Sequence, residues 1–262
     1  MPTTIQPVYP TPQHAAASRA VLAFFQEREG VEAVLLVNSC ARGKATRDSC
    51  LDIVVLYRPA GTDIKTLEAL WYAHCTSAPV FAELERAGKY AEVHLDILTG
   101  EYAPSHREWT GGPDDFELQI GNHLVYSHPL WQGGDYLGEL KARWLPYYPD
   151  ELRRERLALA RLYCLNNLHH IPLYVERGLY FQSFDRLYNA FKEFLQALFI
   201  HRRLYPIAYD KWIHEQVAEI LGLPELYAQI PPLFEIERFE SRALIDKAQV
   251  LEELLETYAP EA

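Results

Sequence analysis

The chain has 262 residues, and its 36 acidic and 25 basic residues give a formal net charge of −11. This length suffices for one large domain or two modest ones, each with its own core. The acidic balance disfavours nucleic acid as the main partner, because polynucleotide binding depends on phosphate contacts from a basic face, and it fits a small substrate better.

The sequence shows no sign of export or of a membrane span. No apolar run approaches the length needed to cross a bilayer, and residues 1–14 lack the positive start and apolar block of a signal peptide. The four cysteines (Cys40, Cys50, Cys75 and Cys164) form no CxxC pair, and no histidine lies at zinc-ligand spacing from two of them. We therefore expect a cytoplasmic protein with free thiols and no membrane association.

The first part of the chain alternates between helical and strand patterns. Apolar residues at helical spacing predict a helix over residues 16–29, which ends at Gly30. Short apolar runs predict strands at 31–37, 51–57 and 91–98, and helices are expected at 63–73 and 79–87 between them. Strands separated by helices indicate a mixed or parallel sheet.

The second part changes in composition. Residues 101–138 are rich in Gly, Pro, Asp, Trp and His and predict loops with a short strand around 124–126. The aromatic, proline-containing segment at 144–149 predicts a boundary between domains at 1–143 and 144–262. Helices are expected beyond it at 150–167, 171–178, 184–201, 209–221 and 240–258. The predicted fold class is thus α+β: a mixed β-sheet flanked by helices, followed by a C-terminal all-α helical bundle.

The segment most informative about chemistry spans residues 37–55. A strand ends at the small polar pair Asn38-Ser39, and a loop containing Arg42 and Lys44 follows. The next strand then opens with an acid, Asp52.

This pattern resembles the signature of the polymerase-β-like nucleotidyltransferase superfamily, in which a strand, Gly-Ser and a loop of about ten residues precede Asp-x-Asp on the next strand. Small bacterial and aminoglycoside-modifying members often show Gly-Ser-x-Ala-Arg-Gly, and this chain has Asn38-Ser39-Cys40-Ala41-Arg42-Gly43 there. The resemblance implies a nucleotidyltransferase fold for the N-terminal domain. It also implies that Asp52 is the second acid of the pair and that Asp96 is a third acid on a later strand.

The chemistry implied by the resemblance is transfer of a nucleoside monophosphate from a nucleoside triphosphate, with ATP expected, to a hydroxyl of a small molecule. Residues two apart on a strand face the same side, so paired carboxylates can hold Mg²⁺ against the triphosphate. Asp52 and Asp96 are the expected Mg²⁺ ligands, and Ser39, Arg42 and Lys44 the expected phosphate-binding residues.

Two positions depart from the family pattern. Asn38 replaces the first glycine, which is tolerable because Asn accepts left-handed backbone better than most residues. Cys50 replaces the first acid, and a thiol is a poor ligand for Mg²⁺. Asp48, Glu92 or Asp96 would then have to supply the missing carboxylate. An alternative function therefore stays open: a catalytically inactive relative that binds a nucleotide or, like an antitoxin, a protein partner.

Each of these residues also has a purely structural interpretation. Asp52 could be an acid in a strand-opening turn, although its spacing from Ser39 favours a functional role. Asp96 could equally be a polar residue on a half-exposed strand. Glu92 and His94 are expected to face solvent, and Cys40 is expected to pack in the core.

In the helical half, the predicted helix 184–201 places Asp185, Asn189 and Glu193 at steps of four on one face. Taken alone, such a row is expected to be solvated surface. The surrounding sequence, with Tyr205-Pro206 and Lys211-Trp212 beyond it, resembles the helical domain of bacterial nucleotidyltransferase-like proteins. The resemblance implies that Glu193 or Asp185 acts as general base toward the acceptor hydroxyl, and the choice between them stays open.

Overall fold

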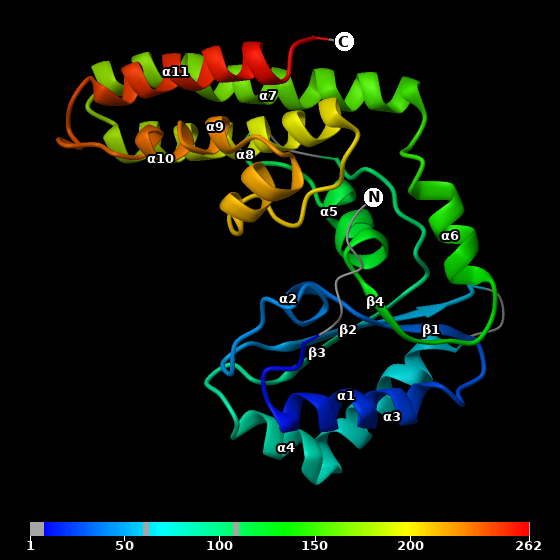
Figure 1. Cartoon of the computed structure of the whole chain (residues 1–262). Helices are drawn as coiled ribbons and strands as arrows, with labels where there is room; N and C mark the ends of the chain where they lie inside the picture. The colour runs from blue at the N-terminus through cyan, green and yellow to red at the C-terminus, as the bar shows by residue number, and fades with distance from the viewer. Residues whose placement is uncertain (1–7, 60–62, 107–109, 262) are drawn as a thin grey trace. The chain divides into compact units, whose positions relative to one another are not determined.

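The computed structural model describes residues 8–59, 63–106 and 110–261. The chain divides into two compact units, each built from two stretches of sequence. The sheet unit comprises Met1–Tyr102 and Ile120–Pro146, and the helical unit comprises Ala103–Gln119 and Tyr147–Ala262. Figure 1 shows the elements of both units.

The sheet unit contains a four-stranded mixed sheet in the order β3-β2-β1-β4. Its strands are β1 (Val31–Leu36), β2 (Leu51–Tyr57), β3 (Val93–Leu98) and β4 (His128–Gln132). β1 pairs antiparallel with β2 and β4, whereas β2 and β3 are parallel. The α+β class, the mixed sheet and the three strands expected in the first hundred residues are confirmed.

Helices α1 (Pro12–Phe25), α3 (Ile64–Ser77) and α4 (Pro79–Glu85) contribute to the core on one face of this sheet. The strand side chains in that core include Ile53 and Val55 of β2. Since successive strand residues point to opposite faces, Asp52 and Val54 belong to the other face. The Asp52 side chain therefore lies on the face of the sheet that these three helices do not cover.

The region before β4 differs from the prediction. The strand expected around 124–126 is wrong: Gly121–Val125 is a π-helical turn that continues α5 (Phe116–Ile120), and the Tyr126 N–H donates to the Gly121 carbonyl at 2.9 Å. A short apolar run fits a buried helix as well as a strand, and here Leu124 is buried in helical form. The strand comes later, at β4, an edge strand that tolerates Pro129. α6 (Tyr136–Trp144) follows it.

The helical unit is built around three long helices: α7 (Asp150–Glu176), α8 (Tyr180–Arg202) and α11 (Ala243–Tyr258). The prediction of two helices at 150–167 and 171–178 is wrong, because α7 runs through Pro172 without a break. Ile171 and Val175 belong to the buried core of this unit, and Asn167 accepts a hydrogen bond from Arg186 of α8 at 2.8 Å. Packing against α8 thus outweighs the helix-breaking tendency of proline.

The helix expected at 209–221 forms only in its second half, as the π-helix η2 (Glu215–Ile220). The buried side chain of Gln216 accepts a hydrogen bond from the Ile207 N–H and donates to the carbonyls of Ala208 and Lys211. These bonds hold residues 207–211 in an irregular turn in place of a helix. Two short helices follow, α9 (Pro224–Tyr227) and α10 (Ile230–Leu233).

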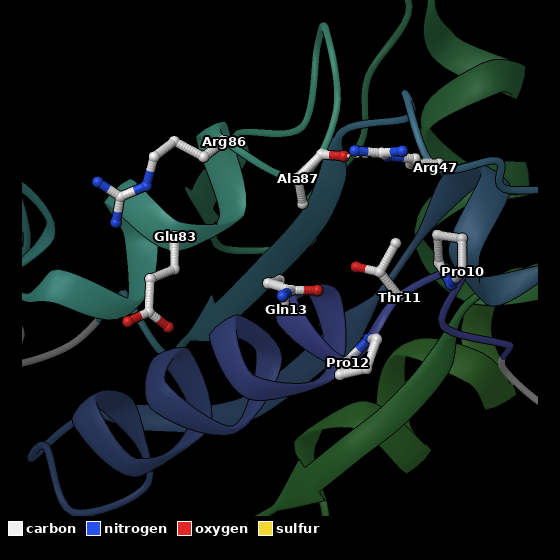
Figure 2. A pocket seen from close by; sticks show the side chains of 8 residues that line it. All are labelled: Pro10, Thr11, Pro12, Gln13, Arg47, Glu83, Arg86 and Ala87. Atoms are coloured by element: carbon white, nitrogen blue, oxygen red, sulfur yellow. Dashed lines mark hydrogen bonds between the residues drawn. The ribbon is translucent and has the colours of Figure 1, made fainter.

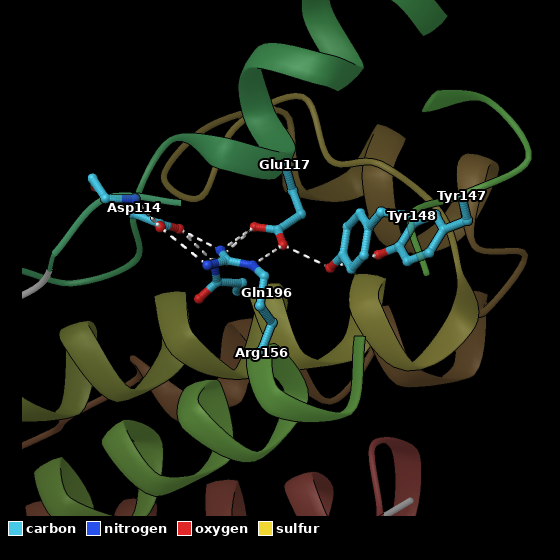
Figure 3. Close-up of polar contacts among 7 residues, drawn as sticks. Asp114, Glu117, Tyr147, Tyr148, Arg156 and Gln196 are labelled. Carbon is cyan, nitrogen blue, oxygen red and sulfur yellow. Dashed lines mark hydrogen bonds and ion pairs between the residues drawn. The ribbon is translucent and has the colours of Figure 1, made fainter. Parts of the chain in front are cut away.

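A buried polar network, which Figure 3 shows, explains why residues 103–119 belong to the helical unit and not to the predicted domain 1–143. Arg156 of α7 pairs with Asp114 and with Glu117, each at 2.5 Å. Gln196 of α8 donates to both carboxylates, and Tyr148 donates to Glu117 at 2.8 Å. Buried charges are stable only when paired and hydrogen-bonded, so this network ties the segment to α7 and α8. The second boundary lies between Pro146 and Tyr147.

Candidate functional site

The turn at the end of β1 begins the site. Asn38 has a φ of 56°, so the sequence-based expectation that it accepts left-handed backbone is confirmed. It opens the single helical turn α2 (Asn38–Ala41), after which the Lys44 N–H donates to the Ser39 carbonyl at 2.9 Å. The Val37 N–H donates to the Asp52 carbonyl at 3.0 Å. The turn and the first residues of β2 are therefore neighbours.

The loop between the turn and β2 is held from two sides. His14 in α1 is fully buried, and its Nε2 lies 2.9 Å from the Ser49 carbonyl. Its Nδ1 lies 2.7 Å from the hydroxyl of Thr11, the residue that caps α1. On the other side, the Asp48 carboxylate accepts a hydrogen bond from the Lys89 N–H at 2.9 Å. Asp48 is thus occupied as a turn residue, which argues against its taking over the role of the missing acid.

Asp52 lies at the start of β2 with 8% of its surface exposed. The Cys50 thiol lies 3.3 Å from both of its carboxylate oxygens. Cys40 packs nearby in the core, as expected, and burial together with the Asp52 charge raises its pKa to about 12. Cys40 therefore stays a neutral thiol, and Cys50 is the sulfur next to the acid.

His94 is the neighbour of Asp52 that the sequence analysis missed. The parallel register of β2 and β3 places His94 beside Asp52, with its Nδ1 3.4 Å from Asp52 Oδ1. Its Nε2 lies 3.0 Å from a carboxylate oxygen of Glu92. Both His94 and Glu92 have exposed side chains, as expected from the sequence, but they also interact with each other, and His94 interacts with Asp52.

Asp96 lies one step further along β3, in register with Val54. It shares a face with His94 and is exposed. Asp96 interacts electrostatically with His123 of η1, and this raises the pKa of that histidine, but burial dominates and lowers it to about 4. Asp96, the second predicted Mg²⁺ ligand, thus lies on the same face of the sheet as Asp52, but His94 and not Asp96 is the residue of β3 in register with Asp52.

The predicted phosphate-binding residues differ in exposure. Ser39 is half-buried, Lys44 is exposed, and Arg42 has only 3% of its surface exposed. Arg47 in the same loop is exposed as well. Lys44 is therefore the predicted basic residue best placed to meet a phosphate from solvent.

A surface pocket of the sheet unit lies elsewhere. Figure 2 shows it at the start of α1 and the end of α4. Its lining residues are Pro10, Thr11, Pro12, Gln13, Arg47, Glu83, Arg86 and Ala87. None of the residues predicted from the sequence to bind nucleotide or metal lines this pocket.

The donor atoms around Asp52 decide which cation suits this site. Cys50 Sγ, an Asp52 carboxylate oxygen and a His94 ring nitrogen all lie within 4.8 Å of one another. Mg²⁺ requires an octahedral shell of oxygens, and a thiol and an imidazole are the wrong ligands for it. The residues present here therefore do not fit the Mg²⁺ expected from the sequence.

In the helical unit the acid row on α8 is not the solvated surface expected of it in isolation. Asp185 is exposed and accepts a hydrogen bond from Asn189 at 3.2 Å, but Asn189 and Glu193 are buried. Glu193 has 1% of its surface exposed and contributes, after burial, to raising the pKa of the Cys164 thiol of α7. Of the two predicted bases, only Asp185 is open to solvent.

No protein-family model matches the chain, and no curated protein matches it by sequence. Among solved structures, the chain is similar to a nucleotidyltransferase-like protein from Exiguobacterium sibiricum 255-15. The two share 12% identity and a TM-score of 0.45, over 93% of this chain and 76% of the other. So distant a likeness carries no inference about activity, which has to come from the residues of the site. The described residues include no helix both long and apolar enough to span a bilayer.

Proposed function

We propose that the chain binds a nucleoside triphosphate where β1 ends and β2 begins, and transfers its nucleoside monophosphate to a hydroxyl of a small molecule. The observation that carries this proposal is the hydrogen bond from Val37 N–H to the Asp52 carbonyl, 3.0 Å long. It holds the two halves of the signature, the Asn38-Ser39 turn and the acid of β2, next to each other. The left-handed Asn38 supports the same conclusion, because this backbone conformation is the one that the glycine of the signature supplies.

Each group at the turn has a role in the proposed complex. The Ser39 hydroxyl and the backbone N–H groups of the turn donate hydrogen bonds to phosphate oxygens. Lys44, exposed at the end of the turn, offers its ammonium group to the same phosphates. Asp52 provides the negative charge that positions a cation next to the triphosphate.

In the proposed transfer, the acceptor's hydroxyl oxygen bonds to the α-phosphorus while the bond from that phosphorus to pyrophosphate breaks. The hydroxyl proton must pass to a base, for which the sequence offers Asp185 and Glu193. Exposure favours Asp185, because a base has to reach the hydroxyl and Glu193 is 1% exposed. The proposal specifies the acceptor only as a small molecule with a hydroxyl group.

Calorimetric titration of ATP, GTP, CTP and UTP, with and without a divalent cation, tests nucleotide binding. We expect one of the four to bind, and to bind at least about tenfold more weakly to Ser39→Ala and to Asp52→Asn. Ser39→Ala loses a hydrogen bond to a phosphate oxygen, and Asp52→Asn loses the charge that positions the cation. Asp48→Asn is the matched control: it removes an acid from the same loop, but one turned toward Lys89. The proposal is refuted if no nucleotide binds, or if Asp52→Asn binds like the unchanged chain.

Pyrophosphate release tests the transfer step. The assay would use the nucleotide that binds and a set of hydroxyl-bearing acceptors that includes cationic aminoglycosides. We expect Asp52→Ala to abolish release, and Asp185→Asn to reduce it more than Glu193→Gln does. Nucleotide binding combined with release that Asp52→Ala leaves unchanged would contradict transfer at this site.

A second function, binding without catalysis, has its own supporting observation. Cys50 takes the place of the first acid and directs its sulfur at the remaining one, 3.3 Å away. A chain of this kind would bind a nucleotide or a protein partner without turning the nucleotide over. Nucleotide binding that no divalent cation strengthens would favour this function, as would copurification of a helical protein partner.

A further inference from the structure

Three side chains of different chemistry converge where β2 and β3 begin: the Cys50 thiol, the Asp52 carboxylate and the His94 imidazole. We propose that these three residues bind a thiophilic divalent cation of the Zn²⁺ class. This inference deepens the proposed function, because it names the cation of that same site. Its test below uses no nucleotide, so that its failure and the failure of nucleotide binding can be told apart.

The distances between the donor atoms suit a tetrahedral ion. Zn²⁺ binds oxygen and nitrogen at about 2.0–2.2 Å and sulfur at about 2.3 Å, so neighbouring ligand atoms in a tetrahedral shell lie roughly 3.3–3.8 Å apart. Cys50 Sγ lies 3.3 Å from the Asp52 oxygens, and His94 Nδ1 lies 3.4 Å from Asp52 Oδ1. All three atoms lie within 4.8 Å of one another. Only a small movement of the exposed His94 ring would complete the three-ligand arrangement.

The orientation of the His94 ring is a second observation that points to a metal. Its Nε2 lies 3.0 Å from a Glu92 carboxylate oxygen while its Nδ1 faces Asp52. Histidines that ligate metals almost always give their other ring nitrogen to a carboxylate or carbonyl, which fixes the tautomer and makes the free nitrogen more basic. Glu92 is therefore the positioning residue, and it leaves Nδ1 to bind the ion.

Ligand chemistry then selects the cation. One sulfur, one nitrogen and one carboxylate suit Zn²⁺ and its neighbours among the first-row metals, whereas Mg²⁺ and Ca²⁺ need shells of oxygens. Three protein ligands also leave the fourth tetrahedral position for water or a substrate oxygen. The His94 side chain is 56% exposed, so that fourth position is open to solvent.

The same three side chains can also interact without any ion: the Cys50 thiol then donates a hydrogen bond to the Asp52 carboxylate, and the His94 imidazole pairs with the same carboxylate. Metal titration of the full chain, reduced with a phosphine that does not chelate metals, separates the two cases. We expect one equivalent of Zn²⁺ to bind at least about tenfold more tightly than Mg²⁺. Binding of Co²⁺ should give the sulfur-to-metal absorption of a thiolate ligand. Equal affinity for Zn²⁺ and Mg²⁺, or Co²⁺ binding without that band, overturns the inference.

Single substitutions assign the ligands. Cys50→Ser and His94→Asn should each weaken Zn²⁺ binding by about 100-fold, and Glu92→Gln by about tenfold, because it acts through His94. Cys75→Ser and His169→Asn are the matched controls. Cys75 is a partly exposed thiol of α3, and His169 is an exposed histidine that, like His94, pairs with a glutamate. Loss of Zn²⁺ binding in the controls, or its retention in Cys50→Ser, would place the ion elsewhere and refute the site.

Cys50→Asp supplies the opposite test. It restores the pair of carboxylates two residues apart, whose hard oxygens prefer Mg²⁺. We expect this variant to lose at least about tenfold in Zn²⁺ affinity and to gain Mg²⁺ binding, and thereby to reverse the preference of the unchanged chain. If the preference for Zn²⁺ persists in Cys50→Asp, the thiol does not select the metal and the inference fails.

Discussion

The two units use charged residues in opposite ways. In the helical unit, Arg156 is enclosed by Asp114 and Glu117, and Gln196 and Tyr148 supply the remaining hydrogen bonds, all from buried side chains. In the sheet unit, Asp52 is joined by a thiol and by an exposed imidazole, at distances that leave room for an ion. A saturated network holds chain segments together, whereas a group of ligand atoms facing one open position can bind something else.

The comparison predicts that charged residues contribute far more to the stability of the helical unit than to that of the sheet unit. Arg156→Ala should have the largest effect on the free energy of unfolding, a loss of about 3–5 kcal/mol, because it leaves two buried carboxylates uncompensated. Denaturant unfolding of the full chain, followed by circular dichroism, measures it. Arg154→Ala, at an exposed position of the same helix, should cost less than about 0.5 kcal/mol. A similar small loss for both variants would mean that the network does not hold residues 103–119.

A partly buried histidine of the sheet unit, His123, provides a second test of the comparison. Burial lowers the pKa of His123 from 6.5 to about 4, and among the described residues its Nδ1 has no hydrogen-bond partner. Its pKa is lower in the folded state than in the unfolded state, so below about pH 6.5 the unfolded state binds the proton more readily. The free energy of unfolding is therefore highest above about pH 6.5 and falls as the pH is lowered toward 4. We expect the loss to be about 2 kcal/mol and to be absent in His123→Phe. Unfolding free energies at pH 7 and 4.5 measure it; parallel curves for both proteins would contradict the assignment.

The turn at Asn38 should give a smaller effect. Its φ of 56° penalises residues with an ordinary Cβ, so Asn38→Ala should cost about 1 kcal/mol. Asn38→Gly should stay within about 0.5 kcal/mol, because glycine adopts this backbone freely. Thermal unfolding of the two variants measures the difference. If alanine were tolerated as well as glycine, the turn would not have this conformation in solution.

The smallest effect belongs to the acid of the site itself. Asp52→Asn should change the free energy of unfolding by less than about 0.5 kcal/mol, because the amide oxygen still accepts a hydrogen bond from Cys50. Glu117→Gln is the matched change in the helical unit, and it should cost about 1–3 kcal/mol, because it breaks the buried pair with Arg156. Equal losses in the two variants would erase the distinction between a binding group and a structural one.

The sequence by itself determined the elements whose signals are local. Mostly apolar runs identify β1 and β2, since strands buried on both faces are rich in apolar residues. The small polar pair after β1 identifies the left-handed turn at Asn38. Spacing from that turn singles out Asp52 as an acid worth testing. The strong helical period of residues 184–201 likewise identifies α8.

Only the tertiary structure decided which distant residues meet. The parallel register of β2 and β3 puts His94 beside Asp52, and no local pattern specifies the register between strands far apart in sequence. In the same way, Arg156 draws residues 103–119 into the helical unit, and packing against α8 carries α7 through Pro172. Each of these outcomes depends on contacts between different elements of the fold, which no local sequence pattern specifies.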